Sequence, residues 1–119
     1  MILQTLPAAS GWRLFKVEGQ LDFAAAPTVQ AALCHAVDIE QSDLLIDLED
    51  LKTADEKGVG VLKTTLRRLL ADHPSLRVAI VAKHAWLADE LAKEKYPAPI
   101  MLFRSGSEAL HSIQLHQAA

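Results

Sequence analysis

The sequence predicts a single α/β domain, with a mixed and mostly parallel sheet of about five strands and about four helices. Short apolar runs alternate with stretches in which apolar residues recur at helical spacing, which is typical of a sheet covered by helices. The chain has 119 residues, half of them apolar, which is enough for one hydrophobic core and too few for two. We therefore expect one domain over residues 1–119, with a tail that frays from about residue 114.

The N-terminal segments predict a β-hairpin followed by a helix. Residues 2–6 and 12–18 carry the apolar and aromatic side chains of strands, and residues 8–11 form the turn between them. Pro7 suits the edge of a sheet. Pro27 fits the first turn of a helix, because its missing N–H would have no partner there. The apolar face of this helix consists of Val29, Ala32, Leu33, Ala36 and Val37.

The central stretch, residues 43–70, runs from a strand through a polar turn into a second helix. The strand has consecutive apolar residues, as expected when both faces are covered: Leu44, Leu45, Ile46 and Leu48. From Val59 the apolar period becomes helical, with Leu62, Leu66, Leu69 and Leu70 facing inward and Lys63, Arg67 and Arg68 facing water. We interpret residues 53–60 as the turn. Backbone N–H groups at a helix start can receive a ligand, so this turn is the first place to look for a site.

The remaining segments predict two further strand–helix units. Residues 76–82 and 100–103 are apolar strands, and residues 84–95 have helical spacing. Residues 105–108 match a capping box, in which Ser105 accepts a hydrogen bond from the backbone N–H of Glu108, and they open the last helix. The predicted order is strand, strand, helix, followed by three strand–helix pairs.

Charge and cysteine content exclude several classes of function. The net charge is -3, and the basic residues are dispersed, so we expect no nucleic-acid binding. The single cysteine, Cys34, excludes an internal disulfide and fits a reducing compartment. No apolar run approaches the roughly 20 residues needed to span a bilayer, and residues 1–9 lack a basic segment followed by a long apolar core. We expect a cytoplasmic protein without direct membrane insertion.

Residues that could carry chemistry form no recognised pattern. Gly58 and Gly60 lack the third glycine of a dinucleotide fingerprint, because Lys63 stands there, and the two glycines are explained by tight packing at the helix start. Asp47 and Asp55 could converge and divide acid and base roles, but no nucleophile accompanies them. Asp55 is explained more simply as the N-cap of the second helix.

The remaining candidates also have structural explanations. The five histidines lack metal-ligand spacing and are expected to be solvated or locally hydrogen-bonded: His35, His73, His84, His111 and His116. We expect Cys34 to act as a small buried hydrophobe, and Trp12 and Trp86 to serve core or edge packing. The sequence therefore predicts no enzyme, no metal and no cofactor.

Residues 19–22, 45–48 and 55–62 together resemble the STAS domain, the family of bacterial anti-sigma-factor antagonists, and the resemblance covers nearly the whole chain. In that family the turn typically reads Asp-Ser-Ser-Gly-Leu-Gly-Val-Leu. A partner kinase, itself an anti-sigma factor, phosphorylates the serine just before the first glycine. Lys57 stands at that position and Glu56 at the position of the first serine. No phosphorylation is therefore expected at Lys57, and Thr53 is the one nearby hydroxyl that could replace it.

The resemblance implies a non-enzymatic module that docks a cytoplasmic signalling protein, of the anti-sigma-factor or kinase type, through residues 55–60 and the second helix. The expected contact residues are Asp22, Asp55, Glu56, Lys57, Gly58, Gly60, Lys63, Thr64 and Arg67. Lys57 is either a solvated residue in a member that lost its switch or the partner of an acidic group. The alternative is an accessory subunit of a transport complex, for example in lipid ABC transport. The basic face of the second helix would then meet a transporter subunit.

Overall fold

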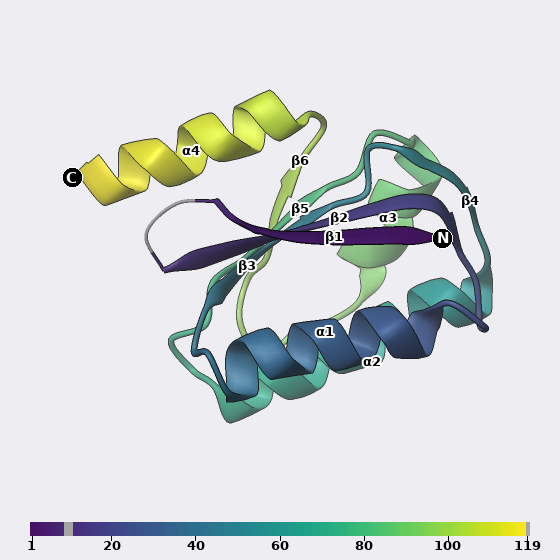
Figure 1. The fold of residues 1–119 in the computed structure, drawn as a ribbon, viewed down its shortest axis with the longest axis horizontal. Helices are drawn as coiled ribbons and strands as arrows, with labels where there is room; N and C mark the ends of the chain where they lie inside the picture. The colour runs from purple at the N-terminus through teal and green to yellow at the C-terminus, as the bar shows by residue number, and fades with distance from the viewer. Residues whose placement is uncertain (9–10, 119) are drawn as a thin grey trace.

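A six-stranded sheet organises the computed structural model, which describes residues 1–8 and 11–118. The elements, shown in Figure 1, follow in the order β1 (Ile2–Pro7), β2 (Trp12–Leu21), α1 (Ala26–Asp38), β3 (Asp43–Asp47), β4 (Leu51–Ala54), α2 (Glu56–Asp72), β5 (Val78–Val81), α3 (Ala85–Lys93), β6 (Met101–Phe103) and α4 (Gly106–Ala118). The strand order is β1-β2-β3-β5-β6, with β4 paired to β2 off this path. Among the strands of the described residues, only β1 is antiparallel to its neighbour. The predicted α/β class and mixed sheet are confirmed.

Helices cover both faces of the sheet and create two separate cores. Helices α1 and α2 lie on one side and α4 on the other (Figure 1), and the buried leucines of α3 join the α1–α2 side. Successive side chains of a strand point to opposite faces. Leu44 and Ile46 of β3 therefore enter this main core, whereas Leu45 enters a small core under α4. The other buried members of the small core are Trp12, Ala79, Val81, Ala109 and Ile113.

Strand β4 is the element that the sequence did not predict. Lys52 and Thr53 are exposed, so the segment reads as part of a polar turn, but it pairs in parallel with the end of β2. The register shifts between Gly19 and Gln20, and Gly19 has a φ of 89°. This irregularity turns the end of β2 away from β3 and toward β4. The interpretation of residues 53–60 as a turn was therefore wrong, because α2 begins at Glu56 and not at Val59.

The locally encoded features agree with the sequence. Pro27 lies in the first turn of α1, and the side chain of Ser105 accepts a hydrogen bond from the Glu108 N–H at 3.2 Å. The buried residues of α1 include Val29, Leu33, Ala36 and Val37, as predicted, while Ala32 is half-buried. The turn predicted at residues 8–11 falls partly on residues 9–10, which lie outside the described residues. The frayed tail stays a prediction, because α4 is described to Ala118.

The two tryptophans differ in their environments. Trp12 has 4% of its surface exposed and belongs to the small core, which confirms the expected packing role. Trp86 is 47% exposed in the first turn of α3, so the expectation of core or edge packing was wrong for this residue. The helical spacing around it places Leu87 and Leu91 inward and leaves Trp86 at the surface.

Candidate functional site

Asp55 fixes the start of α2. Its backbone is extended, with φ -110° and ψ 166°, and its Oδ1 accepts a hydrogen bond from the Gly58 N–H at 2.6 Å. The predicted N-cap is therefore confirmed. Because this carboxylate is engaged by the helix backbone, Asp55 acts on the site mainly by holding the following residues, Glu56 and Lys57, in place at the surface.

Gly58 and Gly60 serve different purposes, although the sequence gives them the same explanation. An ideal Cβ on Gly58 would lie 2.4 Å from the backbone oxygen of Leu21 and 2.9 Å from the backbone carbon of Asp22. A Cβ on Gly60 would meet no atom within 4 Å. Close packing therefore requires glycine at Gly58, and the expected packing role of Gly60 was wrong.

The loop after β2 completes the surface at the start of α2. The Asp22 Oδ1 accepts a hydrogen bond from the Ala25 N–H at 2.8 Å, which closes the loop and leaves Phe23 63% exposed. The Lys57 Nζ lies 5.8 Å from the centroid of the Phe23 ring, within the range of a cation–π contact. Lys57 is therefore placed by an aromatic neighbour. Sequence reasoning missed Phe23, although a lone aromatic residue in a short loop after an aspartate was the available signal.

The basic residues of α2 are not a free positive surface. The Lys63 Nζ lies 3.6 Å from a carboxylate oxygen of Glu90 and 3.9 Å from one of Glu94, both in the α3 region. Arg67 also pairs with Glu94. The structure therefore does not place Lys63 and Arg67 as unengaged contact residues, and the expected basic face is largely neutralised. Thr64, between them, is exposed.

Asp47 belongs to a different part of the molecule. Its Oδ1 accepts a hydrogen bond from the Glu49 N–H at 2.9 Å, and the Glu49 Oε2 accepts one from the Gly106 N–H of α4 at 3.3 Å. Burial raises the pKa of Asp47 above the ordinary value. Asp47 and Asp55 thus belong to separate hydrogen-bond networks, and the structure gives no support to a shared acid–base role.

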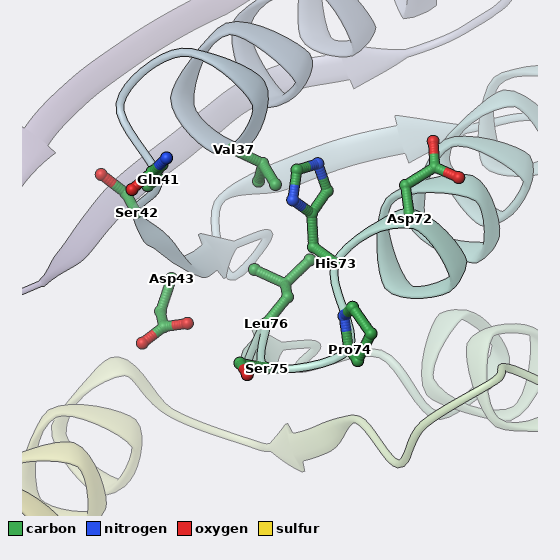
Figure 2. Close-up of a pocket in the computed structure, with 9 residues that line it drawn as sticks. All are labelled: Val37, Gln41, Ser42, Asp43, Asp72, His73, Pro74, Ser75 and Leu76. Carbon is green, nitrogen blue, oxygen red and sulfur yellow. The ribbon is translucent and has the colours of Figure 1, made fainter.

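A hollow of about 370 Å³ lies at the opposite end of the sheet, between the ends of α1 and α2. Figure 2 shows His73 beside Val37, with Leu76 below it and Asp43, at the start of β3, across the hollow. Ligands of open α/β sheets bind outside the carboxyl ends of the strands. This hollow lies at the amino ends of β3 and β5, whereas the start of α2 lies at the carboxyl side, so we take the α2 start as the candidate site.

Asp38 links the two helix ends beside this hollow and predicts a pH effect. Its carboxylate accepts hydrogen bonds from Arg68 at 2.9 Å and pairs with the His73 Nε2 at 2.8 Å, contacts that hold the pKa of Asp38 below the ordinary value. A depressed folded-state pKa stabilises the protein above the unfolded value, about 3.9, and this gain disappears as pH falls through the folded pKa. Asp38→Asn should therefore lower the urea midpoint at pH 7. The difference from the wild type should shrink as pH falls below about 3.9 and through the folded-state pKa of Asp38, and a difference that stays constant over this range would contradict this origin.

Cys34 and the histidines give no further site. Cys34 is half-buried, and the Arg68 guanidinium donates to its Sγ at 3.2 Å, a contact that the sequence could not reveal. Within the described part of the chain, no three His, Cys, Asp or Glu side chains are arranged to hold a metal ion. The side chain of His116 lies outside the described residues. No helix of the described chain is long and apolar enough to cross a membrane.

Comparisons with known proteins place the chain in a family. The STAS domain model matches residues 4–94, so the chain belongs to the STAS domain family. Two of the similar solved structures are of SpoIIAA. One is the anti-sigma factor antagonist SpoIIAA in its unphosphorylated form, and the other is the Bacillus cell fate determinant SpoIIAA in its phosphorylated form. The unphosphorylated structure superposes with a TM-score of 0.73 at 18% identity, covering 95% of this chain and 98% of that one.

Other similar structures come from antagonists and from a transporter. An anti-sigma factor antagonist from Mycobacterium paratuberculosis gives a TM-score of 0.63 at 20% identity, with 95% of each chain covered. The murine Slc26a9 anion transporter gives 0.66 at 15% identity, covering 92% of this chain and 18% of that one. At these identities the likeness establishes the fold. Curated proteins gave no match.

Proposed function

We propose that this chain is a non-enzymatic docking domain that binds a cytoplasmic signalling protein through the start of α2. The docking face consists of Asp22, Phe23, Glu56, Lys57, Gly60 and Thr64. The observation that carries the proposal is the pairing of an exposed aromatic ring with a cation, Phe23 with Lys57, on a capped helix start. Aromatic side chains that are large and already held in place contribute most of the binding energy at protein interfaces.

Gly60 supports docking at the same face. Glycine in a helix interior costs about 0.5–1 kcal/mol relative to alanine, and no packing neighbour requires it here. A partner backbone that approaches α2 closely at this position would account for the missing side chain. The exposed Thr64 lies one turn further along the helix and extends the face in that direction.

The partner class follows from the family. The fold matches anti-sigma factor antagonists, so an anti-sigma factor or a related kinase is the proposed partner. The family resemblance aligns Lys57 with the serine that the partner kinase typically phosphorylates, and a lysine cannot accept a phosphate by that chemistry. We therefore propose that docking here is not switched by phosphoserine, and that the Lys57 charge meets an acidic group of the partner.

Lys57→Glu is expected to reduce partner capture at least about tenfold, because it reverses the charge at the centre of the docking face and breaks the contact with Phe23. Quantitative mass spectrometry of proteins retained from a native lysate measures the loss. Lys95→Glu is the matched control. It makes the same charge change at an exposed lysine that follows the C-terminal end of α3, outside the docking face. If the Lys57→Glu and Lys95→Glu variants capture equal amounts of the partner, the docking face is wrongly placed.

Phosphate mapping gives a second test. The protein isolated from its native cells should carry no phosphate on residues 53–64, which include the exposed hydroxyl of Thr53 on β4. Peptide mass spectrometry with phosphopeptide enrichment measures this directly. A phosphate on Thr53 in a substantial share of the molecules would show that the switch had moved to β4.

The second candidate function is an accessory domain of a transport complex. The likeness to the domain of the Slc26a9 transporter favours it, although the basic face of α2 expected to meet a transporter subunit is engaged by Glu90 and Glu94. The two functions are separated by identifying the protein whose capture from the lysate is lost in Lys57→Glu. A kinase or anti-sigma factor supports signalling, whereas a transporter subunit supports transport.

A further inference from the structure

A groove of about 340 Å³ lies between β4 and the start of α3. We call it the β4 groove; its walls are Leu51, Lys52, Thr53 and Ala54 on one side and His84, Trp86 and Leu87 on the other. It lies at the carboxyl side of the sheet, next to the docking face, because β4 leads directly into Asp55 and α2. This is the side on which open α/β sheets bind their ligands.

One wall of the groove is a strand edge. Within the described chain β4 pairs with β2 alone, so its second edge has no strand beside it, and all four of its residues line the β4 groove. A strand edge presents backbone N–H and C=O groups that can pair with another extended chain. Recognition by strand addition uses such an edge for affinity and neighbouring pockets for selectivity.

The other wall supplies an apolar platform. Trp86 is 47% exposed, which is unusual for a side chain of this size, and Leu51 and Leu87 beneath the groove are buried. A large aromatic side chain at the rim of an apolar hollow is a frequent centre of binding energy. An apolar side chain of a segment laid along β4 would cover Trp86.

The charges around the groove select the occupant. Lys52 and Lys83 are exposed, and neither forms an ion pair with another described residue. The exposed imidazole of His84, which lines the groove, adds a hydrogen-bonding group. Of the two carboxylates that flank β4, Asp50 pairs with Lys16 at 3.1 Å and Asp55 caps α2. A segment that carries acidic side chains beside an apolar one therefore complements this groove.

We propose that the β4 groove receives an extended, acidic segment of the protein partner, which adds as a strand to β4 and places an apolar side chain against Trp86. This inference rests on the proposed docking function and extends the docking face across β4. A second copy of the chain fits less well. The two edge strands of the main strand order, β1 (Ile-Leu-Gln-Thr-Leu-Pro) and β6 (Met-Leu-Phe), carry no acidic side chain to meet Lys52 and Lys83.

A peptide titration tests the groove without the natural partner. The probe is a short acetylated and amidated peptide in which glutamate alternates with leucine and valine, added to the ¹⁵N-labelled full chain. We expect chemical-shift changes at the Trp86 indole N–H and at the β4 amides, but not at the buried Trp12 indole. The same peptide with lysine in place of glutamate should bind at least about tenfold more weakly. A peptide N-methylated on alternate residues, which cannot form the ladder, should not bind.

Variants connect the groove to the partner. Trp86→Ala and Lys52→Glu should each weaken binding of the acidic peptide and reduce capture of the partner, both at least about tenfold. Lys95→Glu should change neither the peptide affinity nor the capture. Equal binding of the N-methylated peptide, shifts confined to residues outside the groove, or full partner capture by Trp86→Ala would each overturn the inference. Partner capture lost with Lys57→Glu but kept with Trp86→Ala would refute the groove while leaving the docking function intact. Insensitivity of capture to Lys57→Glu would instead refute the docking face.

Discussion

Gly58→Ala is expected to lower the free energy of unfolding by about 2–3 kcal/mol, because the new methyl group has no space. The atoms that it would meet are the backbone oxygen of Leu21 at 2.4 Å and backbone carbons of Leu21 and Asp22. Backbone atoms cannot rotate away as a flexible side chain can. The start of α2 or the end of β2 must therefore move, and this cost exceeds the gain of about 0.5–1 kcal/mol that alanine gives in a helix.

Urea unfolding followed by far-UV circular dichroism measures the effect, and Gly60→Ala is the matched control. The control makes the same substitution in the same helix where nothing lies within 4 Å of the new Cβ, so it should raise stability by about 0.5–1 kcal/mol. Opposite signs for the two substitutions are the expected result. Equal losses would mean that the contact between Gly58 and Leu21 does not limit the position of α2.

The features that local sequence encodes could be predicted. The apolar face of α1, the cap at Asp55 and the cap at Ser105 depend on residues within one or two turns, so their periodicity and spacing are visible in the sequence. The family resemblance is confirmed by the STAS match, and the mixed, mostly parallel sheet agrees with the structure. The docking face that the resemblance implies at the start of α2 stays a proposal.

The strand β4 depends on a partner far away in the chain. Only Leu51 of its residues is buried, and Lys52 and Thr53 resemble any exposed turn. The strand exists because β2 continues past an irregularity at Gly19 and presents its last residues to β4. No periodicity of the segment itself could show this, and the β4 groove was missed for the same reason.

The contacts between side chains at the site could not be predicted from the sequence either. Phe23 and Lys57 meet because the loop after β2 packs on the start of α2, where Gly58 allows close approach. Lys63 and Arg67 are held in ion pairs because the α3 region packs beside α2 and its acidic residues face them. Helical spacing correctly placed both basic residues outside the main core, but it could not show that another helix occupies that side.

Trp12→Ala is expected to cost about 3–5 kcal/mol, whereas Trp86→Ala should change stability by no more than about 0.5 kcal/mol. Trp12 is 4% exposed and fills the small core under α4, and the Arg77 guanidinium lies 4.9 Å from the centroid of its ring. Arg77 is itself held by Asp43 at 2.8 Å. Loss of the Trp12 indole therefore leaves a cavity and removes the ring on which the Arg77 guanidinium stacks. Truncation of Trp86 removes a side chain that is largely exposed to solvent.

Urea unfolding compares the two variants, and hydrogen exchange shows where the loss falls. Because Trp12 packs with Ala109 and Ile113, its removal should speed amide exchange in α4 more than in α1 or α2, which pack on the main core. Trp12→Phe keeps an aromatic ring in the small core and should show a smaller change in the same direction. If α4 kept its protection in Trp12→Ala while α1 and α2 lost theirs, the small core would not be what fastens α4 to the sheet.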